Sequence, residues 1–268
     1  MEENNVSGIQ GVDTRELMKV IQQNGTMKAL ICDIEKPLVE CMKVINEYCE
    51  ASNLVQTVTS KKVWYSRTPN PIYNVAVLDL GTKLNLIKGL NQAGCNVISF
   101  PYNTTKEEIL KYKPNGLFIS SGPGNPESLQ DVVELIKSFI GVLPIFGVGL
   151  GHQLIGLAYG ASTLKMKTGH HGCNYPVRNL KTGKVEISLQ NHLYTIDRQS
   201  LKGTNLKVTH ENVITNEVEG LEDSKNKVMS IEFEPFTIEG YEVKIKAKNE
   251  DEEDKKIYIL NKDDLDVA

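Results

Sequence analysis

The chain has 268 residues, of which 40% are hydrophobic and 24% charged, proportions that are ordinary for a globular protein with a buried core. Its formal net charge is −4 at pH 7, and no cluster of lysine and arginine supplies the positive field that a nucleic acid or an anionic membrane would need. No apolar stretch approaches the roughly 20 residues of a membrane span, and the acidic start does not resemble a signal peptide, so a cytoplasmic location is expected.

The five cysteines are an odd number and form no C-x-x-C pair. Such a set predicts neither a disulfide framework nor a zinc site. We therefore expect no metal and no cofactor.

Residues 1–66 are expected to form a separate N-terminal segment. Asp13 precedes apolar residues at helical spacing and predicts a capped helix that ends near Gly25. A short strand is expected over residues 29–32 and a second helix over residues 37–49. The segment has too little apolar surface to be a robust domain by itself.

Residues 67–74 contain two prolines and are expected to be a linker. Strands and helices alternate after it, with buried strands expected over residues 75–80, 96–100, 116–120 and 143–147. Thr104 with Glu107 predicts a capping box at the start of one of the intervening helices. This alternation predicts an α/β fold with a doubly wound, mostly parallel sheet, in which ligands bind at the carboxyl ends of the strands.

After Gly160 the pattern changes to short β-rich runs, which predict an antiparallel extension of the sheet. The runs are residues 185–189, 206–209, 228–231 and 241–245. The main domain is therefore expected over residues 75–247. Residues 248–268 begin with an acidic run and are expected to be a connector and tail.

Residues 143–154 have the pattern of a strand, a sharp turn and a helix. Such a turn presents the nucleophile of many α/β enzymes beside a helix N-terminus. The central residue here is Gly149, which has no side chain. The loop 120–126, with two glycines and two prolines, follows another strand; it is either a plain loop or one that holds N–H groups toward an oxyanion.

Four stretches resemble, in family order, the class I glutamine amidotransferase domain of the carbamoyl-phosphate synthetase small subunit. They are residues 120–126, 146–153, 165–174 and 190–192, and residues 11–15 resemble the end of that subunit's N-terminal domain. The resemblance implies a class I glutamine amidotransferase-like fold. Residues 1–66 would then be a remnant of the N-terminal domain, whose large upstream part is missing.

The resemblance also implies a glutaminase with a Cys-His-Glu triad that supplies ammonia to a synthetase large subunit. The triad positions fall on Gly149, Glu234 and Phe236, none of which can act by the family's route. We therefore expect a catalytically inactive scaffold or regulatory partner of a large subunit. The alternative is a glutamine-hydrolysing small subunit that serves pyrimidine or arginine biosynthesis. An engineered change at position 149 alone would not account for the other two positions.

Some of the positions that correspond to the family's glutamine contacts carry the family's residue, and others do not. The candidate substrate-binding residues are Gly122, Gly124, Leu150, Gln153, Asn191, Leu193 and Tyr194. Leu193 stands where the family has glycine, and its branched side chain would fill space that the substrate needs. The sequence therefore argues against glutamine binding.

The histidines suggest two further sites. Cys173 follows the pair His170 and His171, which could activate a thiol, but a structural role for this stretch is favoured. A metal site built from these two histidines with His152 and His192 is disfavoured, because adjacent side chains diverge and no i, i+4 ligand spacing occurs.

Overall fold

The computed structural model describes residues 8–32, 36–49, 54–235, 241–244 and 258–261. The chain divides into two compact units. One comprises residues 1–51 with 166–169, and the other comprises residues 52–165 with 170–268. None of the described helices is long and apolar enough to cross a membrane.

The smaller unit contains helices α1 (Thr14–Asn24) and α2 (Leu38–Glu47). The carboxylate of Asp13 accepts hydrogen bonds from the first backbone N–H groups of α1, and Gly25 ends the helix at φ 80°, which confirms the predicted caps. The strand expected over residues 29–32 does not form in this described stretch. A strand forms only where its backbone groups pair with those of a neighbouring strand.

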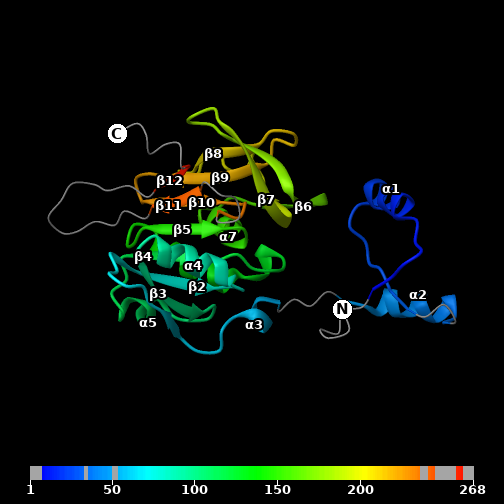
Figure 1. Ribbon diagram of the computed structural model, residues 1–268, viewed down its shortest axis with the longest axis horizontal. Helices are drawn as coiled ribbons and strands as arrows, with labels where there is room; N and C mark the ends of the chain where they lie inside the picture. Colours follow the sequence, from blue (N-terminus) through cyan, green and yellow to red (C-terminus); the bar gives the residue numbers. More distant parts are fainter. Residues whose placement is uncertain (1–7, 33–35, 50–53, 236–240, 245–257, 262–268) are drawn as a thin grey trace. The chain divides into compact units, whose positions relative to one another are not determined.

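The larger unit contains the sheet and the helices that cover it (Figure 1). Its helical elements are α3 (Leu54–Val58), α4 (Leu84–Gln92), α5 (Lys106–Leu110), the 3-10 helix η2 (Pro126–Ser128), α6 (Gln130–Phe139) and α7 (Leu150–Ala158). Its strands are β1 (Trp64–Ser66), β2 (Tyr73–Asp79), β3 (Cys95–Pro101), β4 (Gly116–Ile119), β5 (Ile145–Val148), β6 (Thr163–Asn179), β7 (Val185–Ile196), β8 (Lys207–Asn212), β9 (Val218–Asp223), β10 (Val228–Ile231), β11 (Tyr241–Lys244) and β12 (Tyr258–Asn261).

Ten strands form one sheet in the order β1-β3-β2-β4-β5-β10-β9-β8-β6-β7. The central strands, in the order β3, β2, β4, β5 and β10, pair in parallel with one another. At one edge β1 pairs antiparallel with β3. Beyond β10 the sheet continues through β9, β8, β6 and β7, each pairing antiparallel with the strand before it. The predicted α/β fold with an antiparallel extension is thus confirmed as one mixed sheet. Two of the runs assigned to that extension differ: residues 228–231 form β10, which also pairs in parallel with β5, and β11 lies outside this sheet. Strands β11 and β12 pair with each other in a second, two-stranded sheet.

Apolar side chains bury both faces of the parallel strands. One cluster joins the sheet to α3, α5, α6 and α7 and includes Leu78, Ile119 and Leu154. The other cluster joins the opposite face to α4 and includes Val77 and Phe146. Burial on both faces explains why these strands read as continuous apolar runs in the sequence.

Several elements differ from the sequence expectations. Residues 54–66, which the sequence pattern places in the N-terminal segment, contain β1, which pairs with β3, and α3, whose Val55 is in the core. The capping box is formed by Thr105 and Glu108, one residue later than predicted. The 17-residue strand β6 and the strand β9 were not expected. The acidic run 249–254 lies outside the described residues.

Candidate functional site

Gly149 forms the predicted turn between β5 and α7. Its backbone has φ 55° and ψ −116°, in the region that residues with a side chain rarely adopt. The N–H of Gly149 donates to the carbonyl oxygen of Ile231 at 2.9 Å, which ties the turn to the end of the neighbouring strand β10. The strand-turn-helix prediction is confirmed, and the backbone keeps a conformation that glycine adopts without strain.

A side chain at position 149 would be crowded and strained, though not blocked by the backbone. A Cβ placed there would lie 3.3 Å from Cβ of Ser121 and 3.8 Å from the carbonyl oxygen of Glu232. The first distance is tight, and Cβ of Ser121 can yield only by a small shift of the loop that carries it. It also shows that the loop 120–126 and the turn at Gly149 lie against each other, because both follow the carboxyl ends of parallel strands.

The loop 120–126 packs closely on the end of β2. The hydroxyl of Ser120 accepts from the N–H of Leu80 at 2.9 Å and donates to the carbonyl oxygen of Ser121 at 2.9 Å. A Cβ at Gly122 would lie under 3.0 Å from the backbone oxygen of Leu80. Gly124 has φ 101°, which also favours glycine. Both glycines therefore have structural reasons to be glycine.

Glu234 lies at the same edge of the sheet as Gly149. It follows β10, whose Ile231 is in register with Val148 of β5. Its carboxylate forms an ion pair with Nζ of Lys83 at 2.7 Å, and its side chain is only 14% exposed. Lys83 is the N-cap residue of α4. The position assigned to the triad's base thus holds a carboxylate that is bound to an ammonium group; Phe236 lies outside the described residues.

Gln153 is predicted to contact substrate, and the structure places it in a buried network. Its side-chain amide donates to the carbonyl oxygen of Tyr194 at 3.0 Å and to Oε1 of Glu232 at 2.9 Å. Both amide protons are therefore used within the protein. Of the other candidates, Leu150 is buried, Leu193 and Tyr194 are partly buried, and Asn191 is exposed.

Glu232 is buried beside this amide, and sequence reasoning gave it no role. Burial raises the pKa of its carboxyl well above the usual value, the charge of Glu219 adds to the rise, and the hydrogen bond from Gln153 opposes it. Nε2 of His152 lies 3.8 Å from Oε2 of Glu232, and Nδ1 of His152 is 2.9 Å from the hydroxyl of Ser230. Burial lowers the pKa of His152 to about 3, so its ring is neutral near pH 7.

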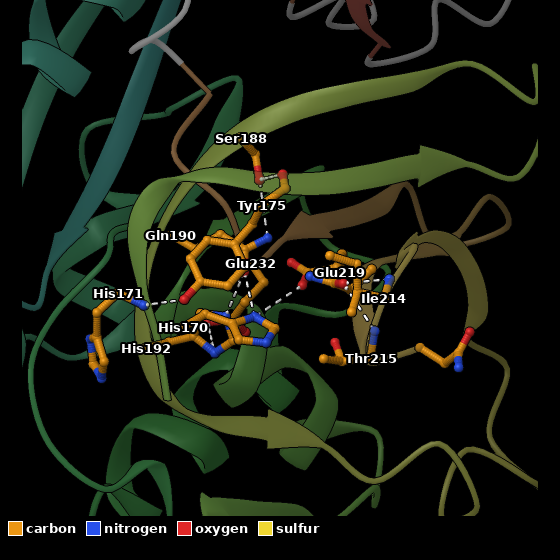
Figure 2. A network of polar contacts seen from close by, with 12 residues as sticks. His170, His171, Tyr175, Ser188, Gln190, His192, Ile214, Thr215, Glu219 and Glu232 are labelled. Atoms are coloured by element: carbon orange, nitrogen blue, oxygen red, sulfur yellow. Dashed lines mark hydrogen bonds and ion pairs between the residues drawn. The ribbon is translucent and has the colours of Figure 1, made fainter. Parts of the chain in front are cut away.

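A second group of buried polar side chains adjoins Glu232 (Figure 2). His170 and His192 are cross-strand partners on β6 and β7, and both lie within hydrogen-bond distance of Oε1 of Gln190. Glu219 of β9 reaches them from the other side: its Oε1 is 3.8 Å from Nδ1 of His170. Sequence reasoning missed this grouping, because neither β9 nor the full length of β6 was predicted.

The His170–His171 pair diverges, as expected for adjacent strand residues. His170 is buried, whereas His171 is exposed and its Nδ1 lies 2.7 Å from Oδ1 of Asn191. Cys173 is also exposed. The buried imidazole of His170 therefore faces Gln190 and Glu219, on the side of the strand away from solvent.

Comparison with known proteins identifies the family to which this geometry corresponds. A family model described as class-I glutamine amidotransferase matches residues 76–245. The carbamoyl phosphate synthase small chain of Bacillus caldolyticus is 39% identical over 242 residues, which are 90% of this chain and 66% of that protein. The small chain of Staphylococcus saprophyticus is 40% identical over 240 residues, which are 90% of this chain and 65% of that protein. The chain thus spans just under two thirds of the length of these relatives, and the predicted resemblance is confirmed.

A solved structure supports the fold independently. A protein from Thermoplasma acidophilum, described as a component of GMP synthase, superposes with a TM-score of 0.54 at 21% sequence identity. The superposition covers 62% of this chain and 85% of that protein. At this level of identity the similarity concerns the architecture alone.

Proposed function

Because this chain belongs to the class I glutamine amidotransferase family, we propose that it is a catalytically inactive relative of the carbamoyl-phosphate synthetase small subunit. In this role it serves as a scaffold or regulatory partner of a synthetase large subunit. The observation that carries the proposal is Gly149, which occupies the nucleophile's turn with the turn's backbone conformation and no side chain.

The surroundings of the turn support the same conclusion. Covalent hydrolysis of an amide needs a nucleophile and a base within hydrogen-bond reach of each other. Position 149 offers no nucleophile, and the carboxylate of Glu234 at the base position is held 2.7 Å from the ammonium of Lys83. The backbone conformation of the turn at Gly149 and the packed loop 120–126 are nevertheless present. A fold kept without its reactive groups supports a docking role.

We expect the purified chain to release no glutamate from glutamine above the rate of a protein-free blank. The reason is that position 149 carries no thiol and position 234 no imidazole, so no thioester can form at the turn. The measurement is a coupled glutamate assay, run with the chain alone and in the presence of a synthetase large subunit. The matched control is Cys173→Ser, which removes an exposed thiol outside the turn. Glutamate release that this substitution abolishes would overturn the inactive assignment.

We expect a synthetase large subunit to copurify with the tagged chain from its native cells, near equal stoichiometry. Docking that depends on the fold should survive Gly149→Ala, because a Cβ there meets only the side chain of Ser121 within 3.4 Å. Mass spectrometry of the purified complex identifies the partner. Copurification without any synthetase subunit, from cells that contain one, would contradict the scaffold role.

The second candidate is a working, glutamine-hydrolysing small subunit. The identity of 39–40% to carbamoyl phosphate synthase small chains favours it. This role requires a nucleophile other than position 149, and the glutamate assay in the presence of the large subunit distinguishes the two candidates. Glutamine-dependent carbamoyl phosphate formation by the reconstituted pair would establish the second candidate.

A further inference from the structure

Three buried side chains direct potential ligand atoms toward one point. They are His170, His192 and Glu219, and one ligand atom from each lies within 4.8 Å of those of the other two. They come from three strands, β6, β7 and β9, so the fold rather than a local motif brings them together (Figure 2). We propose that this cluster is a binding site for a divalent transition-metal ion of the zinc type.

The orientation of the Gln190 amide is determined by a chain of hydrogen bonds. The hydroxyl of Ser188 donates its one proton to the carbonyl oxygen of Tyr175 at 3.0 Å. The same hydroxyl can therefore only accept from Gln190, whose Nε2 is 3.0 Å away. Oε1 of Gln190 must then face the two imidazoles, at 2.6 Å from Nδ1 of His170 and 3.1 Å from Nε2 of His192.

With the amide in this orientation, a lone pair on Nε2 of His192 points at a lone pair on Oε1 of Gln190. Nδ1 of His192 lies 2.8 Å from the carbonyl oxygen of Tyr194, which can only accept, so Nδ1 carries the proton. Nε2 of the neutral ring is therefore bare, and it faces Oε1 of Gln190 at 3.1 Å.

Glu219 adds a further acceptor to the same point. It is fully buried, and neither of its carboxylate oxygens meets the full hydrogen-bond criteria, although the side-chain amides of Gln190 and Asn212 lie near enough to interact with it. Unsatisfied buried acceptors are rare in folded proteins and call for an explanation. A cation at this point would satisfy Nε2 of His192, an oxygen of Glu219 and an imidazole nitrogen of His170, with Oε1 of Gln190 as a fourth ligand.

The ligand types select the class of metal. Imidazole nitrogen with a carboxylate oxygen suits zinc and its first-row neighbours, whereas magnesium and calcium prefer oxygen ligands alone. The bond from Nδ1 of His192 to a backbone carbonyl is the outer contact that orients a metal-binding imidazole. Oε1 of Glu232 lies 3.7 Å from that same Nδ1, which places a second carboxyl group just outside the ligands.

The test is a titration of the full chain, freed of metal with EDTA and dialysed, with Zn²⁺ and in parallel with Co²⁺. We expect one ion per chain and the visible absorption of cobalt in a site of low coordination number. In the unaltered chain, imidazole NMR signals of His170 and His192 should shift on addition of Zn²⁺, while those of exposed His171 stay in place.

Substitutions test whether the ion binds to the residues of this cluster. Glu219→Gln is nearly isosteric and should weaken Zn²⁺ binding at least tenfold, and His192→Ala should do the same. His171→Ala is the matched control, because this histidine is on the same strand as His170 but exposed. A folded chain that binds no Zn²⁺, or one in which Zn²⁺ shifts the signals of His171 and not those of His170 and His192, would overturn the proposal.

Discussion

Replacing Gly151 by alanine is expected to destabilise the protein by more than about 3 kcal/mol, because the added methyl group has nowhere to go. A Cβ at this position would lie under 3.0 Å from the carbonyl oxygen of Ile119, at the end of β4. Backbone against backbone cannot move apart as a flexible side chain can. Urea unfolding, followed by circular dichroism, measures the loss.

Gly149→Ala is the matched substitution two residues earlier. It introduces the same methyl group at φ 55°, which costs about 1–2 kcal/mol for the backbone conformation, but the nearest neighbour is the side chain of Ser121 at 3.3 Å. The two glycines of one turn should therefore differ clearly in cost. Equal losses for the two variants would show that α7 does not pack on β4 as closely as described.

The stability of the protein is expected to fall as the pH rises from about 6.5 to 8, with EDTA present to keep the chain metal-free. Burial raises the pKa of Glu219 to about 8 and that of Glu232 well above its usual value. In the unfolded chain both ionise near pH 4.5. Above that pH only the unfolded state loses these protons, so each carboxyl costs up to about 1.4 kcal/mol per pH unit.

The buried histidines act in the opposite direction. Burial lowers the pKa of His152 to about 3 and those of His192 and His210 to about 4, from the ordinary 6.5. Their contribution is complete above pH 6.5 and is lost as the pH falls, because the unfolded state then binds protons that the folded state does not. Below about pH 6.5 the three imidazoles change the free energy of unfolding with pH more than the two carboxyls do. Maximal stability is therefore expected near that pH.

The double variant Glu219→Gln with Glu232→Gln should remove most of the decline above about pH 6.5. A glutamine at position 232 can still accept from the Gln153 amide, so the packing is preserved. Glu134→Gln is the control, because that side chain is 69% exposed and paired only on the surface. The free energy of unfolding is measured from urea titrations at each pH. A decline that persists in the double variant would assign the titration to other groups.

The sequence was informative wherever local pattern decides structure. Apolar runs bounded by turns located the parallel strands, and the glycine-rich turn at Gly149 was placed correctly because strand, turn and helix are adjacent in the chain. The sequence also indicated that this turn and the loop 120–126 lie at the same edge of the sheet, because each follows the carboxyl end of a parallel strand.

The buried polar cluster could not be foreseen in the same way. His170 and His192 meet because of the register of a long antiparallel pair, and Glu219 joins them from β9, a strand that is not adjacent to β6 or β7 in the sheet. Neither this register nor this strand order is encoded in a short motif. Polar residues within β6 and β9 also break the alternation that would reveal the strands, because one face of each contributes to this polar interior.

If the chain is inactive as proposed, the ion pair between Lys83 and Glu234 bears on how catalysis could return. A histidine introduced at position 234 alone would face the ammonium of Lys83, and a nearby positive charge disfavours the protonated ring that a base becomes when it accepts a proton. Lys83 would have to change before or together with Glu234, whereas a side chain at position 149 needs no second substitution and carries only the strain of φ 55° and the close contact with Ser121. A single substitution could therefore restore the nucleophile more readily than the base. A reversal that placed histidine at position 234 while Lys83 remained would pass through a variant whose imidazole is a poor base.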